Sequence, residues 1–199
     1  MPLSLMLLVA QAAPVPAYPA GEVLKEFAAV CVGVDQADSG KARAIAAGWR
    51  ETAPEPGSRL AVFLSDTQAL LAKEMAEEGP ATALPTSVLA KEVSGRSLAL
   101  ITSGVMIENM IGRGCRIYDF TAGEQIALEE LKRWSGRDPN LYETREGLTR
   151  AVWNPGLKTG QMEMEVSFIA ADATARKHPA FASLTGLVLT ATAIDLTKE

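Results

Sequence analysis

The stretch FAAVCVGVDQADSGKARAIAAGW, residues 27–49, decides how the rest of the chain is expected to fold. Residues 22–32 carry apolar side chains three or four positions apart, the spacing of one helix face. A second helix is predicted from Asp38 or Ser39, which suit a helix start, to Gly48, which ends it. Two small helices cannot bury their apolar faces alone, so a further layer must cover them. The side chains expected to face this shared core are Phe27, Cys31, Ile45 and Trp49.

A spaced pattern of residues in the same region resembles a known group of proteins. The pattern is Phe27-x3-Cys31, an alanine-rich helix that ends in Gly48-Trp49, and a second cysteine in the Gly-Cys-Arg-Ile of residues 114–117. It is similar to small exported bacterial proteins of uncharacterised function. The resemblance covers residues 27–49 and 112–120, and it implies an exported, single-domain α+β protein. It implies no activity.

The beginning of the chain has the features of a secretory signal peptide. The first charged residue is Glu22, and residues 3–10 form an apolar run that is followed by the Ala-x-Ala of residues 10–12. A second possible cleavage point follows Ala17. The run has no Lys or Arg before it, so an ordinary buried N-terminal segment stays as the alternative. We expect a signal peptide and linker over residues 1–20, a single domain over residues 21–199, and a periplasmic or secreted location.

Composition and charge limit the possible partners. A chain of 199 residues with 48% hydrophobic content is long enough to bury one sizeable core. The net charge of −5 and the pI near 5.1 leave no basic surface for nucleic acid or an anionic membrane. The prolines that interrupt the N-terminal apolar run make it too short to span a bilayer. We therefore expect a soluble protein that is not integral to a membrane and binds no nucleic acid.

The two cysteines are the only covalent link that the sequence offers. In an exported chain, Cys31 and Cys115 are expected to form one disulfide, which would hold the first helix against a strand over residues 115–120. The alternative is a pair of buried free thiols.

Sequence patterns predict the elements between the cysteines. Residues 60–64 (LAVFL) are predicted as a buried strand, and a helix should follow from Ser65 or Asp66 until Gly79-Pro80. Residues 86–93 and 97–103 flank Ser94-Gly95-Arg96 as a β-hairpin. Residues 104–112 are consistent with either a bent strand or a loop. The apolar side chains of the helix that should face inward are Leu70, Leu71 and Met75.

The last third of the chain is predicted to hold one further helix and an antiparallel meander. Thr121-x-x-Glu124 matches a capping box, followed by an apolar stripe that ends at Gly136. Residues 137–146 are predicted as a polar loop. The strands expected after it are residues 148–153, 161–170 and 184–196. The fold class is therefore α+β, with a mostly antiparallel sheet of about five to seven strands, an N-terminal helical pair and a further amphipathic helix packed on it.

Several residues are of types that carry chemistry, but each has a simpler interpretation. Lys158-Thr159-Gly160 matches one element of penicillin-recognising serine enzymes, yet the chain has no Ser-x-x-Lys to supply the nucleophile. His178 lies before a proline in a predicted loop. Tryptophans 49, 134 and 153 fall on apolar stripes and are interpreted as core.

The acidic residues form no convincing metal or acid–base site. Asp35 and Asp38 have calcium-loop chemistry, but a helix cap explains the segment. Glu163 and Glu165 are interpreted as a solvent-facing edge of a strand. A third group of acidic residues is interpreted as a solvated helix face. That group comprises Glu74, Glu77 and Glu78. We therefore predict no catalytic, metal or cofactor-binding residues and no cofactor.

The leading functional hypothesis is a non-enzymatic binding or interaction module of the cell envelope, with an envelope protein or a small ligand as partner. It rests on the lack of a nucleophile, base or metal set in the sequence. The alternative is a small periplasmic hydrolase or transferase with a site assembled from distant loops. The candidates for such a site are Glu108, Asp119, Lys158 and His178. A third possibility is a purely structural envelope component.

Overall fold

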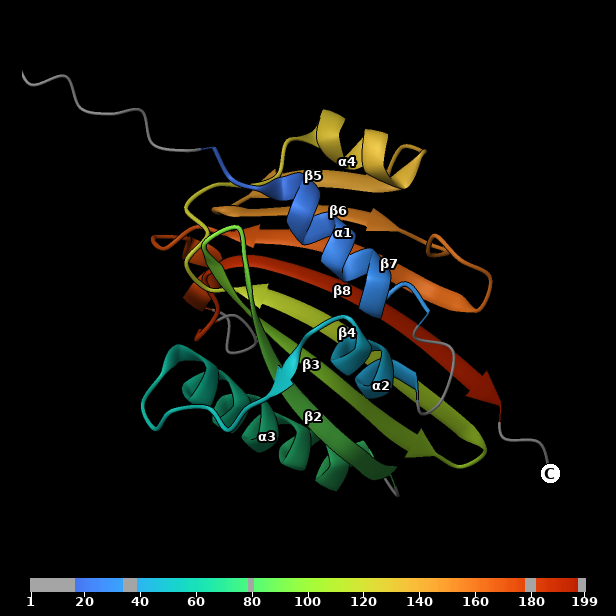
Figure 1. Ribbon diagram of the computed structural model, residues 1–199. Coiled ribbons are helices and arrows are strands. Elements are labelled where there is room, and N and C mark those ends of the chain that lie inside the picture. Colours follow the sequence, from blue (N-terminus) through green and yellow to red (C-terminus); the bar gives the residue numbers. More distant parts are fainter. Residues whose placement is uncertain (1–16, 34–38, 79–80, 178–181, 197–199) are drawn as a thin grey trace, which may run out of the picture.

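An eight-stranded antiparallel sheet forms the centre of the protein in the computed structural model, which describes residues 17–33, 39–78, 81–177 and 182–196. The strand order is β1-β2-β3-β4-β8-β7-β6-β5, and four helices pack on the sheet (Figure 1). The elements are α1 (Ala20–Val30), α2 (Ser39–Ala46), β1 (Arg50–Glu51), α3 (Arg59–Glu78), β2 (Ala81–Val93), β3 (Arg96–Ile107), β4 (Met110–Asp119), α4 (Leu128–Ser135), β5 (Leu141–Arg145), β6 (Leu148–Trp153), β7 (Gln161–Ile169), the 3₁₀ turn η1 (Thr174–Lys177) and β8 (Gly186–Leu196). The predicted α+β class with a mostly antiparallel sheet is confirmed.

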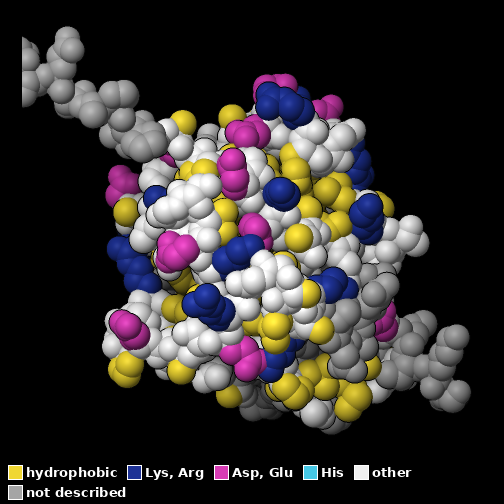
Figure 2. All heavy atoms as spheres, viewed as in Figure 1, with side chains coloured by type: hydrophobic (Ala, Val, Ile, Leu, Met, Phe, Trp, Pro, Cys, Tyr) yellow, Lys and Arg dark blue, Asp and Glu magenta, His cyan; other side chains and the backbone are white. Residues whose placement is uncertain are grey.

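One face of the sheet, here called the α1 face, is covered by α1, α2 and α4 (Figure 1). Alternate residues of the central strands point to this face and meet the apolar stripe of α1 in the main core. Its largest fully buried side chains include Leu24, Phe27, Trp49, Leu100, Ile117, Trp153 and Leu189. On the surface over these elements, acidic and basic side chains are interspersed (Figure 2). The helix predicted over residues 22–32 and the core placement of Trp49 and Trp153 are confirmed.

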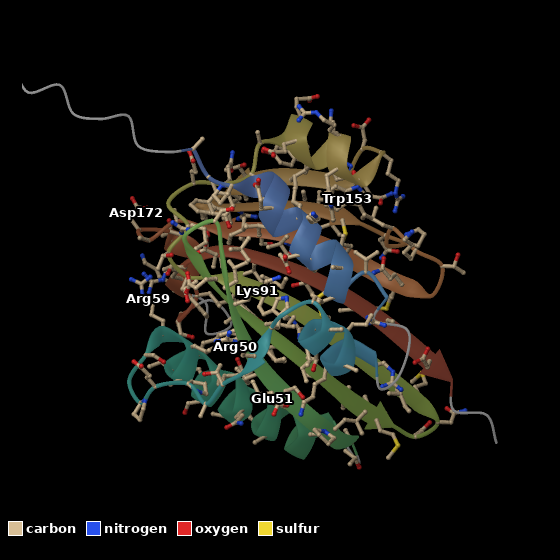
Figure 3. All side chains as sticks on the ribbon, viewed as in Figure 1. Arg50, Glu51, Arg59, Lys91, Trp153 and Asp172 are labelled. Carbon is tan, nitrogen blue, oxygen red and sulfur yellow. A yellow bond between two sulfur atoms is a disulfide. The ribbon has the colours of Figure 1, made fainter. Side chains whose placement is uncertain are left out.

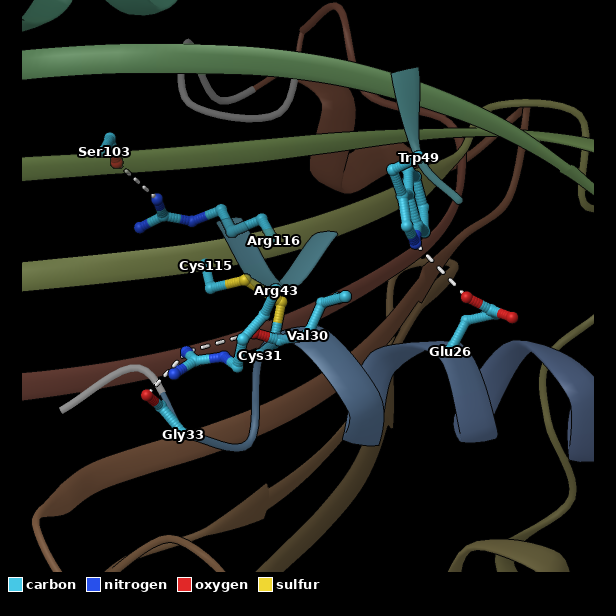
Figure 4. The surroundings of a disulfide bond; sticks show 9 residues. All are labelled: Glu26, Val30, Cys31, Gly33, Arg43, Trp49, Ser103, Cys115 and Arg116. Atoms are coloured by element: carbon cyan, nitrogen blue, oxygen red, sulfur yellow. Dashed lines mark hydrogen bonds between the residues drawn. A yellow bond between two sulfur atoms is a disulfide. The ribbon is translucent and has the colours of Figure 1, made fainter. Parts of the chain in front are cut away.

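The disulfide between Cys31 and Cys115 joins the end of α1 to the middle of β4 (Figure 4). The two Cα atoms are 5.3 Å apart and the cysteines are separated by 84 positions in sequence. Both cysteines are buried. The predicted link between the helical pair and the sheet is therefore present, and neither cysteine is a free thiol.

One predicted core residue of the helical pair is on the outside. Ile45 is 51% exposed, whereas its neighbour Ala44 is fully buried. In a helix, successive residues point about 100° apart, so Ile45 points away from the core when Ala44 points into it. The expectation that Ile45 faces the core was wrong.

The opposite face, here called the α3 face, carries a second and smaller apolar cluster. Phe63 of α3 packs against Tyr118 of β4 with ring centroids 4.9 Å apart, and Tyr118 stacks on Phe120 at 5.5 Å. Arg59, labelled in Figure 3, lies at the start of α3. It donates hydrogen bonds to the Phe120 carbonyl at 2.8 Å and to Thr185 Oγ1 at 2.9 Å. The first turns of α3 are thereby fixed to the sheet.

Residues 60–64 belong to helix α3, so the predicted strand was wrong. The backbone N–H of Ala61 donates to Ser58 Oγ at 3.2 Å, which is an N-cap contact about two turns before the predicted cap at Ser65 or Asp66. A five-residue apolar run suits a buried strand and a buried helix turn equally well. Leu71 was expected to face inward but is 36% exposed. The side chain of Met75 is outside the described residues. The helix ends at Glu78.

The predicted capping box is also wrong. Helix α4 begins at Leu128 after Ala127, and both capping-box residues have partners elsewhere. The hydroxyl of Thr121 donates to Asp119 Oδ1 at 2.8 Å, and Glu124 Oε1 accepts from the backbone N–H of Tyr18 at 3.1 Å. The predicted end is correct, because Gly136 has the left-handed conformation with φ 73°.

The antiparallel strands match the prediction with three additions, the first of which is the short edge strand β1. Residues 104–112, left open by the sequence, form the end of β3, a turn at Glu108-Asn109 and the start of β4. The predicted loop over residues 137–146 contains the edge strand β5, whose five residues are all exposed. The hairpin around Ser94-Gly95 and the strands β6, β7 and β8 are confirmed.

Candidate functional site

The four residues considered for an enzymatic site are not brought together in the part of the chain that is described. Glu108 lies in the exposed turn before β4, whereas Asp119 is the last residue of that strand. Ten residues of strand separate the two ends by roughly 30 Å. Lys158 is exposed in the loop between β6 and β7, and His178 lies outside the described residues.

Asp119 is the centre of a buried ion-pair network. It accepts from Arg96 Nε at 2.8 Å and Nη2 at 3.0 Å, from the Tyr18 hydroxyl at 3.1 Å, and from the N–H of Thr121 at 2.9 Å. The guanidinium of Arg96 also lies 5.4 Å from the centre of the Tyr18 ring. The network therefore holds the N-terminal segment, the β2–β3 hairpin and the end of β4 together.

Hydrogen bonds determine the protonation state of Asp119. Burial alone raises its pKa, but hydrogen bonds from Arg96 and Thr121 and the charge of Arg96 outweigh burial, so the pKa is below its usual value. Burial and the adjacent Asp119 raise the pKa of Tyr18 far above its usual value. Both oxygens of the ionised carboxylate already accept hydrogen bonds, so Asp119 has no free lone pair for acid–base catalysis. Its role is that of a structural anchor.

The other acidic candidates are placed differently from the sequence interpretation. Strand β7 lies between β8 and β6, so Glu163 and Glu165 are not on an edge. Glu165 forms a bidentate pair with Arg150, at 3.0 Å from Nε and 2.6 Å from Nη2. Ser39 begins α2, while residues 34–38 and the side chains of residues 74–80 are outside the described part. Within the described residues, no three His, Cys, Asp or Glu side chains are grouped to hold a metal ion.

A groove of about 550 Å³ lies on the α3 face, between the middle of α3, from Phe63 to Leu71, and strands β2, β3, β4, β8 and the start of β7. This volume is within the range of about 300–1,000 Å³ that small-molecule sites occupy. Most of its lining is apolar or carries hydroxyl groups, and the described residues in it include no Asp, Glu or Lys. Apolar residues of its lining include Leu70, Leu71, Ala83, Val105, Met162 and Ile194.

The course of α3 explains why a groove exists. In its first turns, Leu60, Phe63 and Leu64 pack into the apolar cluster on the sheet. Further along, Leu70 and Leu71 line the groove and are outside that cluster. The helix therefore contacts the sheet at one end and leaves a space at the other.

Glycines form the floor of the groove. Gly112 and Gly114 are two positions apart in β4, so both lie on the α3 face, opposite Val105 and Ser103 of β3. A Cβ at Gly112 would be 3.3 Å from a methyl group of Val105, and one at Gly114 would be 2.8 Å from Nη1 of Arg116. The lack of side chains at these two positions makes the floor of the groove low.

The groove is apolar at its rim as well as inside. Two residues of its lining that extend to the surface are Met162, 45% exposed, and Ile194, 47% exposed. Ile107 and Met110, 42% and 40% exposed, pair with each other at the same end of the β3–β4 hairpin. Exposed apolar side chains that continue the lining of a groove are typical of a binding surface.

The charged member of the groove on the α3 face is Arg116. Its Nη1 donates to Ser103 Oγ at 3.3 Å (Figure 4). Tyr118 stands beside it on the same face, and burial raises the pKa of that phenol to about 12 although the charge of Arg116 lowers it. The phenol is therefore neutral, and the arginine supplies the positive charge.

Sequence reasoning missed every residue of this groove. One signal was present: Gly112-Arg113-Gly114-Cys115-Arg116 places two glycines on one face of a strand. Glycine within a strand often marks a place where a ligand or another backbone approaches closely. The part of α3 that carries Leu70 and Leu71 was predicted as a helix, but the sequence did not indicate that it would lie over these glycines.

Comparison with known proteins gives no further assignment. No protein-family model, no curated protein and no solved structure matches this chain. In the described ranges, no helix is both long and apolar enough to cross a membrane.

Proposed function

We propose that this protein is an exported, non-enzymatic binding protein that takes a small apolar ligand into the groove beneath α3. The observation that carries the proposal is the groove itself, about 550 Å³ and mainly apolar in lining. Its two walls come from different elements, α3 and the sheet, and its floor consists of glycines. Of the candidate acid–base residues, the three that the structure describes, Glu108, Asp119 and Lys158, do not line the groove, which favours binding over catalysis.

Uptake of a neutral fluorescent probe, N-phenylnaphthylamine, tests the groove. We expect its fluorescence to rise on binding to the full chain, and Val105→Trp, which fills the groove, to weaken binding by about tenfold or more. Ile45→Trp adds a tryptophan on the other face of the sheet, where Ile45 is exposed, and should bind like the parent.

A second variant guards against misfolding of the first. Leu71→Gln places an amide in the helix wall of the groove at a side chain that is already 36% exposed. It should fold normally and still bind the probe more weakly. No probe uptake by the parent, or equal uptake by Val105→Trp, would end the proposal.

Export is the second part of the proposal. It is supported by the apolar N-terminal run and by the disulfide, since disulfides persist mainly in oxidising compartments. Of the two predicted cleavage points, the one after Ala17 fits the packing better. Cleavage there would place a new α-ammonium group at the nitrogen of Tyr18, which is 3.1 Å from Glu124 Oε1. The existing hydrogen bond would become an ion pair.

N-terminal sequencing and intact mass of the protein from the native cell fractions test export. We expect a chain that begins at Tyr18, is recovered outside the cytoplasm, and takes up no alkylating reagent before reduction. A chain that begins at Ala13 would contradict the choice of Ala17. A cytoplasmic, full-length chain would contradict export while leaving the ligand groove open to the probe experiment.

A further inference from the structure

Arg116 distinguishes this groove from a simple apolar cleft. The groove lining holds two arginines, and Arg113 pairs with Asp195 on the α1 face, with Nε and Oδ2 2.9 Å apart. Arg116 points to the opposite face, where its guanidinium donates to the hydroxyl of Ser103. No Asp or Glu among the described residues forms an ion pair with Arg116. A half-buried guanidinium held by one neutral hydroxyl leaves most of its five N–H donors for a ligand.

The strand is built to lay this side chain along the floor of the groove. The Cβ position of Gly114 is 2.8 Å from Nη1 of Arg116, so the guanidinium extends back over Gly114. The cross-strand neighbours of Gly114 are Ser103 on β3 and Thr192 on β8. Both residues also line the groove, so one hydroxyl group lies on each side of the strand that carries the guanidinium.

We propose that Arg116 binds the head group of an aliphatic carboxylate, with the chain of the ligand in the apolar part of the groove. This proposal rests on the proposed function and specifies the ligand class. The planar fork of a guanidinium matches a carboxylate with two parallel hydrogen bonds, and the hydroxyl of Ser103, which accepts from Arg116, can donate to the ligand at the side. Leu71, Val105 and Ile194 line the same groove with apolar surface for the chain.

The experiment compares lauric acid with dodecanol, which have the same chain length and differ in the charge of the head group. Each is used to displace N-phenylnaphthylamine from the full chain. We expect lauric acid to bind about 10- to 100-fold more tightly than dodecanol, because a charged hydrogen-bonded pair replaces a neutral one. In Arg116→Met that preference should disappear while dodecanol binds as before. Arg145→Met removes the same charge from an exposed position and should keep the preference.

A second variant keeps the charge and moves it. Gly114→Ala places a methyl group 2.8 Å from Nη1, too close for the present position of the guanidinium, which must shift. We expect a smaller preference for lauric acid with the apolar part of binding retained. Equal affinity of the parent for both compounds would overturn the head-group proposal and leave the groove function standing. Failure of both compounds to displace the probe would overturn both. Tighter binding of dodecyl phosphate than of lauric acid would overturn the choice of a carboxylate.

Discussion

Gly186, at the start of β8, shows how closely the backbone packs at the end of this central strand. A Cβ at this position would lie 2.1 Å from the backbone oxygen of Asp119, and its φ of +86° is one that other residues rarely adopt. Gly186→Ala should therefore lower the free energy of unfolding by about 3 kcal/mol or more, from backbone strain and overlap together.

Urea unfolding of Gly186→Ala and Gly123→Ala checks this prediction. A Cβ at Gly123 would meet no atom within 4 Å, and its φ is not in the left-handed region. The control should unfold within about 0.5 kcal/mol of the parent. Similar midpoints for the two variants would mean that the contact with Asp119 is not close.

Asp119 gives a prediction on pH. Its pKa is lower in the folded protein than in the unfolded chain, so its contribution to stability is fully present above the unfolded value of about 3.9. The contribution is lost as the pH falls through the folded pKa. Asp119→Asn should remove it at neutral pH, at a cost of about 3 kcal/mol because Arg96 and Tyr18 lose their buried anion.

Unfolding measured from pH 7 down to pH 2 separates this effect from general acid denaturation. The difference in stability between the parent and Asp119→Asn should shrink as the pH approaches the folded pKa from above. Asp138→Asn, an exposed partner of Lys132, should follow the parent over the whole range. A gap between the parent and Asp119→Asn that stays constant to pH 2 would contradict the assignment.

At the scale of elements, the two halves of α3 have different roles. Phe63 in the first half is buried against Tyr118 at one end of the groove, whereas Leu71 in the second half lines the groove and is 36% exposed. Phe63→Ala should lower the free energy of unfolding by about 3–4 kcal/mol. Leu71→Ala should change it by less than about 0.5 kcal/mol. Thermal or urea unfolding of the two variants tests this prediction. Comparable losses of unfolding free energy would mean that the whole helix packs on the sheet.

The disulfide is the other element-level link, since it joins α1 to β4 across 84 residues of sequence. In the loop-entropy model, such a link stabilises the fold by about 4–5 kcal/mol. The double variant Cys31→Ala/Cys115→Ala should lose this amount in urea unfolding. The parent under reducing conditions should unfold at nearly the same urea concentration as the double variant. A stable reduced parent would show that packing alone holds α1 in place.

Local patterns predicted the elements whose partners are local, and failed where distant residues compete. The period-two alternation of residues 148–153 and the spacing of α1 both lead to buried faces, so sequence and structure agree there. The capping box at Thr121 failed because Asp119 takes its hydroxyl and Tyr18, over 100 positions away, takes Glu124. Strand β5 was missed because it is an edge, exposed on both sides, and shows no alternation of apolar and polar residues.

The groove could not be predicted for a similar reason at the scale of the molecule. Its parts come from residues 63–71, 83–86, 101–118, 162 and 192–194, and no single segment carries a motif for it. The glycines and Arg116 of β4 acquire a meaning only once α3 lies across them. By contrast, the disulfide was predictable because the chain contains just two cysteines and the location suggested by its N-terminus favours their oxidation.

For the whole molecule, the two faces of the sheet predict how a ligand acts on stability. The α1 face is closed by three helices and a disulfide, whereas the α3 face is closed only at one end. A ligand in the groove would complete the contact between α3 and the sheet. Because it binds only the folded state, lauric acid at about 100 times its dissociation constant should stabilise the protein by about 2.7 kcal/mol.

In a thermal unfolding experiment, that stabilisation corresponds to a rise in Tm of roughly 5–10 °C for a chain of this size. Val105→Trp, with the groove filled, should show no rise, and Arg116→Met should show a smaller rise at the same ligand concentration. Ile45→Trp should behave as the parent, because its new side chain lies on the closed face. An equal rise in Val105→Trp would place the ligand outside the groove, since only a site elsewhere on the molecule is indifferent to that substitution.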